Sequence, residues 1–436
     1  MPIQLHSEQL VQPTHRFDYA NAGDTHENVG KGLGQYGPFD SSTPRDFTEA
    51  KFSIVYPESW EPNVEHFTKA LVRGYSSYFP DGFRKFFRMD SFRADNAIRL
   101  PDDSLNSYLE ALEEVQARDD DFALVFTSNK MRDLGHRSPY WAVKAVLTEA
   151  GVPSQMVMVD RLSTRSPHHV PLKYLIVNIA NQIYAKLGGT PWVVHRPDSP
   201  IDLIIGVGKS VYQTGRIGDT QKTLGFASAY QSNGAFLWYD STEATTSDLS
   251  FYEQLYDTIV SIIHECAQRE GILRNVVIHT YKRIGPAERQ VKNNLEDKHD
   301  DIDITLAHLN NSHNYRIYDD SHQSGLSKRG LWIRTDEDKG FVMTGGRRSY
   351  SPGSPTPIDM TVNGNAPIKT TAQGVFDLCN VYWKDQFGAS MPITIKYAED
   401  IADIFENAQR MNDEGLINVD IDQMVNPQLK RVPWFL

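Results

Sequence analysis

The chain has 436 residues, enough for two or three domains, and its 40% hydrophobic and 11% aromatic content excludes extensive disorder. No apolar run reaches the roughly 18 residues that a membrane span needs, and residues 1–17 lack the basic and apolar regions of a secretion signal. With Cys266 and Cys379 expected as reduced, buried thiols, we predict a cytoplasmic protein without membrane contact. The net charge of −12 counts against a protein that coats nucleic acid alone, but allows a local basic channel or a partner that brings positive charge.

The first half of the chain predicts a parallel sheet. Residues 1–45 are rich in Gly, Asn, Asp, His and Ser, and we expect an irregular segment with one or two strands. From about residue 47 to 160, short apolar strands alternate with helical patterns. The strands are expected at 52–57, 121–128 and 154–159, and the helices at 64–79, 104–116 and 138–151. This alternation is typical of a parallel sheet with helices on both faces.

After residue 190 the order of the expected elements changes. Three hairpin-linked strands come first, followed by a helix, a strand and a second helix, which is the order of an RNase H-like sheet. The strands are expected at 202–207, 224–230, 235–240 and 275–280, and the helices at 252–271 and 285–298. Near the end, helices are expected at 370–386 and 398–411 around a strand at 392–397.

The stretch IDLIIGVGKSV (201–211) runs from a buried strand into a glycine turn that carries Lys209 and Ser210. A phosphate-binding loop of the Walker type requires another glycine five positions before Gly208, where this chain has Leu203. Leu203 lies within the expected strand, so the loop is too short to wrap a pyrophosphate. The sequence therefore argues against a nucleoside triphosphatase.

A line of polar residues follows one expected helix. In VPLKYLIVNIANQIYAKLGG (170–189), apolar residues recur at helical spacing, while Asn178, Gln182 and Lys186 stand four residues apart on one face. Taken alone, this line is more typical of an ordinary solvated stripe. In the helix at 138–151, Ser138 is a suitable N-cap, and Tyr140 and Lys144 lie one turn apart near the positive end of the helix dipole. Gln155 follows just before a strand, so these residues suit a terminal phosphate and its nucleotide.

From about residue 46 onward the chain resembles a short prokaryotic Argonaute, made of a MID domain and a PIWI domain. The resemblance depends on the residues above, on NQIYAKLGGTPW (181–192), on HLNNSHNYRIYD (308–319), which is similar to a PIWI strand pair, and on the C-terminal VPWFL. It implies an α/β fold with a Rossmann-like MID domain followed by an RNase H-like PIWI domain. The expected boundaries are an N-terminal irregular segment at 1–45, the MID domain at 46–188 and the PIWI domain at 189–436.

The resemblance assigns roles to the polar residues of the MID domain. Tyr140 would stack on the first base of a guide strand, while Lys144, Gln155 and Lys186 would contact its 5′ phosphate. Asn178 and Gln182 would support the first nucleotides. In the family a Mg²⁺ ion links the phosphate to the terminal carboxylate, which makes Leu436, with Gln155, a metal-ligand candidate. A plain apolar tail packed on the domain is the alternative for VPWFL.

Cutting members of the family hold two metal ions with a set of four residues, three of them acidic and the last Asp or His. The first aspartate corresponds to Gly208 here, the second to Tyr281 near the end of VVIHTYKR, and the last position to Glu399 in KYAED. The glutamate of the mobile finger has only Glu243 as a candidate by region. Neither Gly nor Tyr can replace an anionic Mg²⁺ ligand, so we expect a catalytically inactive PIWI domain.

The resemblance then implies a role in prokaryotic immunity. The chain would bind a 5′-phosphorylated small guide RNA and pair it with complementary single-stranded DNA of a plasmid or phage without cutting it. Pairing would trigger a partner with an APAZ domain and an effector (a TIR or sirtuin-like NAD-consuming domain, or a nuclease), causing cell death or dormancy, with a higher oligomer on activation. One alternative is a stand-alone minimal Argonaute that binds guide–target duplexes as a homodimer. Another is an enzyme for small phosphorylated substrates, but this alternative does not explain the segments that are similar to a PIWI domain.

Overall fold

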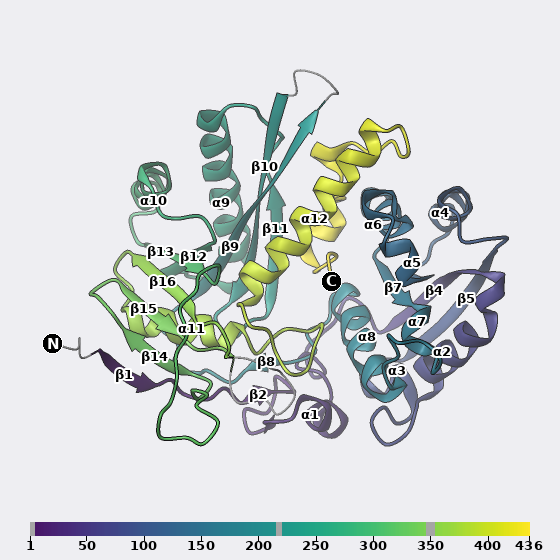
Figure 1. The fold of residues 1–436 in the computed structure, drawn as a ribbon, viewed down its shortest axis with the longest axis horizontal. Helices are drawn as coiled ribbons and strands as arrows, with labels where there is room; N and C mark the ends of the chain where they lie inside the picture. Colours follow the sequence, from purple (N-terminus) through teal and green to yellow (C-terminus); the bar gives the residue numbers. More distant parts are fainter. Residues whose placement is uncertain (1–4, 215–219, 346–353) are drawn as a thin grey trace. The chain divides into compact units, whose positions relative to one another are not determined.

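The computed structural model describes residues 5–214, 220–345 and 354–436 (Figure 1). The chain divides into two compact units that interleave along the sequence. Unit 1 comprises residues 1–14, 194–209 and 224–399, and unit 2 comprises residues 15–193, 210–223 and 400–436. The C-terminal segment from Asp400 therefore groups with residues 15–193 in unit 2.

Unit 2 is built on a four-stranded parallel sheet in the order β5-β4-β6-β7. The strands are β4 (Glu49–Pro57), β5 (Ser91–Leu100), β6 (Phe122–Thr127) and β7 (Ser154–Met158). The main helices are α2 (Glu61–Arg73), α4 (Leu105–Gln116), α6 (Pro139–Glu149) and α8 (Leu172–Lys186), and the short ones are α3 (Gly82–Phe86), α5 (Asn129–Arg132) and α7 (Val159–Leu162). All six residues of β6 are buried, as expected for a central parallel strand covered on both faces.

The expected helices and strands of this sheet form with small shifts at their ends. Helix α4 begins after Ser104, whose hydroxyl accepts from the Ser107 amide, and α6 begins after Ser138 in the same way. Helix α2 ends at Arg73, six residues before the expected end, because Gly74 has a φ of +101° and a Cβ there would lie 2.6 Å from the Asp81 nitrogen. Strand β5 was not expected, since its exposed middle carries no apolar alternation.

The first 45 residues contain more regular structure than expected. Besides β1 (His6–Gln9), β2 (His15–Arg16) and β3 (Thr25–His26) they form a helix, α1 (Val29–Tyr36). The Asn28 side chain caps this helix by accepting from the Lys31 amide, while Leu33 and Val29 supply its buried face. Strands β3 and β2 form a small sheet with β8 (Val193–Val194).

Unit 1 contains a nine-stranded sheet in the order β1-β14-β15-β16-β13-β12-β9-β10-β11. The further strands are β9 (Leu203–Thr214), β10 (Thr220–Gln231), β11 (Phe236–Ser241), β12 (Asn275–Thr280), β13 (Asp303–Asn310), β14 (Leu331–Arg334), β15 (Lys339–Val342) and β16 (Ile358–Asn363). Strand β12 is parallel to both β9 and β13, whereas β10 and β11 are antiparallel to each other. This is the RNase H-like arrangement that the order of elements predicted.

Helices cover both faces of this sheet: α9 (Asp248–Glu270), α10 (Pro286–Lys298), α11 (Ile368–Leu378) and α12 (Ile393–Asp413) (Figure 1). Leu203 and Ile205 of β9 belong to one core cluster with apolar residues of α9 and α10. The intervening Gly206 faces α12, because a Cβ added to it would lie 2.5 Å from the Thr394 carbonyl oxygen. Alternate residues of β9 therefore serve opposite faces.

Three expectations for this half were wrong in whole or in part. Residues 392–397 were expected as a strand, but α12 already begins at Ile393. Ile393, Ile395 and Tyr397 alternate as in a strand, yet Thr394 between them is also fully buried, and a helix start buried on all sides mimics a buried strand. The helix expected at 370–386 ends at Leu378. Of the strand pair expected at 308–319, only β13 is present, because no strand lies between Asn310 and the isolated bridge at Tyr318.

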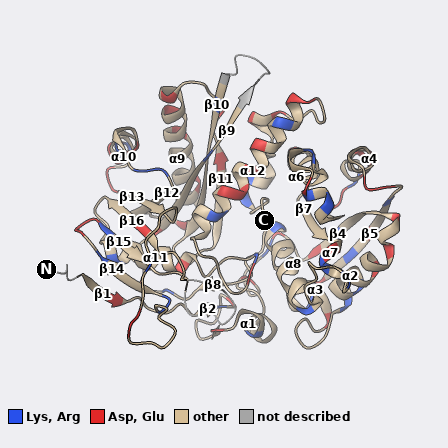
Figure 2. Cartoon of the chain, in the orientation of Figure 1, with Lys and Arg blue, Asp and Glu red and all other residues tan. Residues whose placement is uncertain are grey.

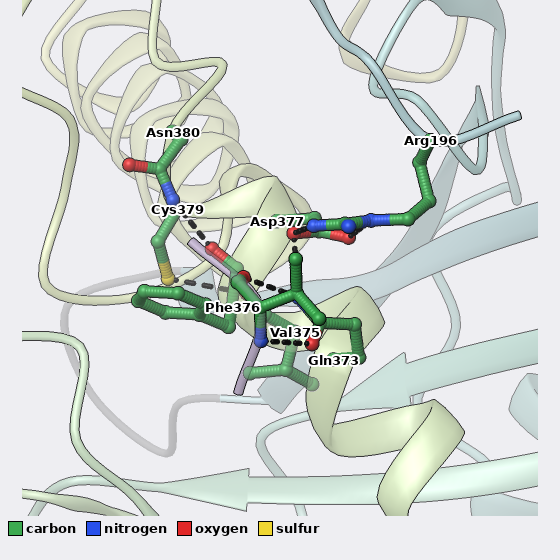
Figure 3. Close-up of polar contacts among 8 residues, drawn as sticks. Arg196, Gln373, Val375, Phe376, Asp377, Cys379 and Asn380 are labelled. Atoms are coloured by element: carbon green, nitrogen blue, oxygen red, sulfur yellow. Dashed lines mark hydrogen bonds and ion pairs between the residues drawn. The ribbon is translucent and has the colours of Figure 1, made fainter. Parts of the chain in front are cut away.

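An ion pair joins a buried carboxylate of α11 to the partly buried Arg196 side chain. The Arg196 guanidinium donates two hydrogen bonds, of 2.7 and 2.8 Å, to the Asp377 carboxylate, and the Gln373 amide donates a third of 2.9 Å (Figure 3). On the same segment, the Cys379 thiol donates to the carbonyl oxygen of Val375, one helical turn earlier. Both cysteines are free and buried, as expected. In the described ranges no helix is long and apolar enough to cross a membrane.

Candidate nucleic-acid interface

Two buried lysines of unit 2 converge on one carbonyl oxygen. Lys144 lies in the middle of α6 and Lys186 is the last residue of α8; their side chains are 1% and 2% exposed. The Lys144 ammonium is 3.2 Å from the Ser154 carbonyl oxygen, and the Lys186 ammonium is 2.8 Å from the same atom. Like charges held this close in the interior repel each other, and an anion between or beside them would offset that repulsion.

Oxygen atoms from two other segments complete this cluster. The Lys186 ammonium donates to the Gln155 side-chain oxygen at 2.6 Å, and the Lys144 ammonium donates to the main-chain oxygens of Leu436 and Trp434 at 3.0 and 3.5 Å. The C-terminal segment is thus inserted into the interior of the unit, with Leu436 only 3% exposed. Figure 2 shows Lys and Arg in blue on α6 and beside the C-terminus. The structure therefore brings together four residues that the sequence singled out far apart.

The polar line along α8 is not a solvated stripe. Gln182 is only 9% exposed and Lys186 is buried, which rules out that alternative for both residues. The Gln182 amide donates to the Asn178 carbonyl oxygen at 3.0 Å, one turn back along the same helix. Asn178 itself is half-buried. The line therefore runs from the half-buried middle of α8 to the lysine cluster at its end.

Tyr140 lies in the first turn of α6, four residues before Lys144 and on the same side of the helix. Its ring is half-buried, packs edge-on against Trp141 at 4.7 Å, and borders the core cluster between the sheet and α4. Burial raises the pKa of its hydroxyl, with the carboxylates of Asp400 and Asp403 adding to the rise. Tyr140 therefore stays a neutral aromatic surface at any physiological pH.

The chemistry of this cluster suits a phosphate better than a bare cation. The Gln155 side-chain oxygen and the Leu436 main-chain oxygen are the kind of ligand that Mg²⁺ takes, but each now accepts from a lysine ammonium. A metal ion fits here only together with an anion that draws those ammonium groups away. In the described residues no three His, Cys, Asp or Glu side chains are grouped to hold a metal.

Sequence reasoning missed two members of the region. The Ser154 carbonyl oxygen joins both lysines but belongs to the main chain, so no residue type marks it. Asn181 on α8 is fully buried, and neither its amide nitrogen nor its oxygen has a hydrogen-bond partner among the described residues. A buried polar residue beside the polar line was the available signal, because an unpaired buried amide costs free energy.

In unit 1, the parallel pairing of β12 with β9 brings two predicted positions together. Thr280 is opposite Val207, so Tyr281 comes next to Gly208 on the adjacent strand. Both border a cavity of about 50 Å³ whose other walls include Phe251, Leu255 and further apolar side chains of α9, α10 and the sheet. Lys209, Lys282 and Glu288 also line this cavity, which lies on the α9 and α10 side of the sheet, whereas a side chain at position 208 would point toward α12.

The space at Gly208 is filled by its neighbours. A Cβ added to Gly208 would lie 2.3 Å from the Phe226 ring and 3.0 Å from the Ala398 methyl carbon. Ala398 is on α12, directly before Glu399. An aspartate at position 208 could be accommodated only if the Phe226 ring moved, since a 2.3 Å contact is far inside van der Waals distance.

The remaining acidic positions are engaged elsewhere or exposed. Glu399 accepts from the Lys396 ammonium at 2.6 Å on the surface of α12. Glu243 is exposed in the loop between β11 and α9. Asp202, six residues before Gly208, accepts from the Arg274 and Asn275 amides at 2.8 and 2.9 Å and so fixes the start of β12. Asp202 thus has a structural role.

Comparison with known proteins finds a family and relatives that match most of the chain. The Piwi domain family matches residues 131–410. An argonaute protein of Cereibacter sphaeroides is 24% identical over 96% of this chain and 58% of its own length, and a Piwi protein of Archaeoglobus fulgidus is 22% identical over 68% of this chain and 71% of its own.

Solved structures agree on the fold. Clostridium butyricum Argonaute, bound to a guide DNA and a 19-mer target DNA, superposes with a TM-score of 0.71 at 18% identity, over 92% of this chain and 53% of that one. Drosophila Piwi superposes with a TM-score of 0.67 at 14% identity, over 99% of this chain and 56% of that one. The chain thus spans little more than half the length of these two structures. With the Piwi domain match covering most of its residues, the chain belongs to the Argonaute/Piwi family.

Proposed function

We propose that the chain binds the 5′-phosphorylated end of a small guide RNA and uses that guide to recognise complementary single-stranded DNA. The observation that supports this most is the pair of buried ammonium groups of Lys144 and Lys186 on the Ser154 carbonyl oxygen. A terminal phosphate would place further negative charge beside the two ammonium groups, and charge-assisted hydrogen bonds to buried lysines are strong. Tyr140 would stack on the first base, and Asn178 and Gln182 would contact the first nucleotides.

A Mg²⁺ ion belongs to the same proposal. Gln155 and the main-chain oxygen of Leu436 would hold it beside the phosphate, and it would neutralise charge between anionic groups. The lysines would then turn from these oxygens to the phosphate. Sequence would be read by base pairing, with the protein following the backbone, as in other guided effectors.

We further propose that the chain does not cut its target. The support is the replacement of two expected carboxylates by Gly208 and Tyr281, and the occupation of the space at Gly208 by Phe226. A two-metal mechanism needs anionic ligands that these residues do not supply. The bound target would instead be reported by a partner, for which we propose an APAZ-domain effector in defence against plasmids or phages.

The charge of the chain supports a partner of this kind. With a net charge of −12, the chain is short of the Lys and Arg that backbone binding requires, and a basic partner would supply them. Guide affinity measured against salt, with and without the co-purified partner, tests this point: the partner should steepen the salt dependence. An unchanged slope, or a homodimer on the guide–target duplex with no other protein bound, would favour a stand-alone Argonaute instead.

The experiment that tests the guide pocket compares an RNA bearing a 5′ phosphate with the same RNA bearing a 5′ hydroxyl, with and without Mg²⁺. We expect the phosphorylated RNA to bind more tightly, and Lys144→Ala to remove most of the difference. Equal affinities for the two RNAs would remove the basis of the proposal.

A further inference from the structure

A second basic surface lies in unit 2, away from the lysine cluster. Between Lys69 and Arg93 the chain has six basic and two acidic residues, a local net charge of +4 in a chain whose total is −12. All six basic side chains are exposed; they are Lys69, Arg73, Arg84, Lys85, Arg88 and Arg93. Such a concentration on an acidic chain indicates an anionic partner.

The surface has a defined shape. Lys69 and Arg73 lie one turn apart on α2, and together with Arg93 of β5 they border a groove of about 520 Å³. Glu61 and Glu65 of α2 line the same groove, so three cations there face two carboxylates. Its floor is formed by Ile54 and Tyr56 of β4 and by the small side chains of β5. Strand β5 is the edge of the sheet, so the groove is open on that side.

Exposed aromatic rings lie beyond the end of α2. Tyr78, in the loop after α2, is 51% exposed, and Tyr174, at the start of α8, is 45% exposed. Their ring centroids are 6.0 Å apart, and the Lys173 ammonium lies 5.1 and 4.8 Å from the two rings. On α2, His66 packs edge-on against Tyr75 of the same loop.

Exposed tyrosines next to lysines and arginines are the combination by which proteins hold single-stranded nucleic acid: the cations follow the phosphates and the rings stack on bases. A solvated charged face does not require two large aromatic side chains in water. The distance between this surface and the lysine cluster also suits a short stretch of single-stranded nucleic acid. Lys173 and Lys186 are thirteen residues apart on one helix, so the surface lies about 20 Å from the lysine cluster.

We infer that this surface, defined by Lys69, Arg73, Arg93, Tyr78, Lys173 and Tyr174, binds the single-stranded 3′ flank of the target, an inference that rests on the proposed function. Because the target pairs antiparallel to the guide, the nucleotides that continue past the guide 5′ end belong to the 3′ side of the target. A strand that leaves the lysine cluster along α8 reaches the tyrosines within a few nucleotides. The flank would thus add affinity that does not depend on its sequence.

The test uses the full chain loaded with one 5′-phosphorylated guide RNA and three labelled DNA targets. The first ends opposite the guide 5′ end, the second carries an unpaired oligo-dT extension on its 3′ side, and the third carries the same extension on its 5′ side. We expect the second target to bind more tightly than the other two. Tyr78→Ala with Tyr174→Ala should reduce that advantage by about 5- to 150-fold per lost stacked base.

Charge variants test the groove and supply the control. Lys69→Gln with Arg73→Gln should weaken the 3′-flanked target and flatten its salt dependence by roughly 0.7 log units per lost phosphate contact. The matched control is Lys31→Gln with Arg118→Gln, which removes the same charge from two exposed residues of this unit that do not belong to the proposed surface. All variants should retain the thermal midpoint of the parent chain and its affinity for the first target.

Equal affinities for the three targets, or a 3′-flank advantage that survives in both surface variants, would overturn the inference. In that case an acidic protein partner becomes the candidate ligand of this surface. If the guide does not bind at all, the proposed function fails separately. Binding of an unpaired dT strand to the guide-free chain, measured with the same variants, then decides whether the surface holds nucleic acid.

Discussion

The Lys186 ammonium lies 2.6 Å from the Gln155 side-chain oxygen in the interior of unit 2, although 31 residues separate them along the chain. This contact joins the end of α8 to β7 at the point where Lys144 also arrives. Burying two ammonium groups together costs free energy of folding, and binding of an anion beside them would offset part of that cost. The position of the proposed guide phosphate is therefore fixed by residues from two helices and a strand.

We expect Lys186→Met to weaken binding of a 5′-phosphorylated RNA by roughly 1.5–3 kcal/mol, the value of a hydrogen bond to a charged group. Binding of the 5′-hydroxyl RNA should change little, because the lost contact is made to the phosphate. Titration of both RNAs by fluorescence anisotropy measures this. The exposed Lys31→Met is the control, and it should leave both affinities unchanged. Equal losses for the two RNAs would mean that Lys186 supports the fold instead of the phosphate.

Restoring the first carboxylate should not restore cleavage. We expect Gly208→Asp to destabilise the chain by about 1–3 kcal/mol, since the new side chain meets the Phe226 ring and the core must shift. Gly208→Asp should cost less when residue 226 is already alanine. The double variant should therefore lose less stability relative to Phe226→Ala than Gly208→Asp loses relative to the parent chain. Urea unfolding gives the stabilities, and a labelled target DNA with a bound guide gives the cleavage. Target cutting by Gly208→Asp alone would contradict this prediction and show that the carboxylate missing at Tyr281 is not required, whereas target cutting by the parent chain would contradict the proposal of an inactive PIWI domain.

His279 should make unit 1 sensitive to acid. Complete burial lowers the pKa of His279 from its ordinary value of 6.5 to about 3, and its Nδ1 is 2.8 Å from the Thr394 hydroxyl. Below pH 6.5 the unfolded chain takes up a proton here that the folded chain does not, so stability falls as the pH falls. The loss from this group should reach about 2 kcal/mol at pH 5.

The measurement for His279 is urea unfolding at pH 7.5 and pH 5. His279→Gln should remove about 2 kcal/mol from the difference between the two pH values, whatever it does to stability at pH 7.5. The exposed His322→Gln should leave the difference as it is. A pH difference that is the same in the parent chain and in His279→Gln would show that His279 titrates alike in the folded and unfolded chain.

The ion pair of Arg196 and Asp377 should be hard to break. The Asp377 side chain is 2% exposed, and burial raises the pKa of its carboxyl more than the Arg196 guanidinium lowers it. Asp377→Ala would leave a nearly buried guanidinium without its carboxylate, which typically costs 3–5 kcal/mol. Urea unfolding again measures this, with the exposed Asp257→Ala as the control. A loss below about 1 kcal/mol would mean that the pair behaves like one on the surface.

How far the sequence determines the structure depends on how far each pattern extends. The buried strands β6 and β12 and the capped helices α4 and α6 were predictable because apolar spacing and cap residues agree within each segment. Strand β5 was not, because the sheet edge exposes it and its polar residues carry no alternation. The start of α12 was misread because a helix buried on every side has no polar face to reveal its period.

Some residues of the candidate site could also be predicted from the sequence, whereas other parts of it could not. Lys144, Gln155 and Lys186 could be proposed from residue type and helical spacing, since both are local properties. The Ser154 carbonyl oxygen and the insertion of Leu436 could not, because they depend on main-chain atoms and on how distant segments pack. Phe226 could not be assigned to Gly208 either, because that contact depends on the packing of side chains from different strands.

Asn181 offers the last prediction, because its buried amide has no hydrogen-bond partner among the described residues. Such a group costs about 1–3 kcal/mol, so Asn181→Leu should stabilise the guide-free chain by an amount of that order. If the amide is kept for the guide, the same variant should also bind 5′-phosphorylated RNA more weakly than the parent chain does. Thermal unfolding and RNA titration of the one variant separate these outcomes: greater stability with unchanged affinity marks Asn181 as a packing defect, and greater stability with weaker binding places its amide in the guide pocket.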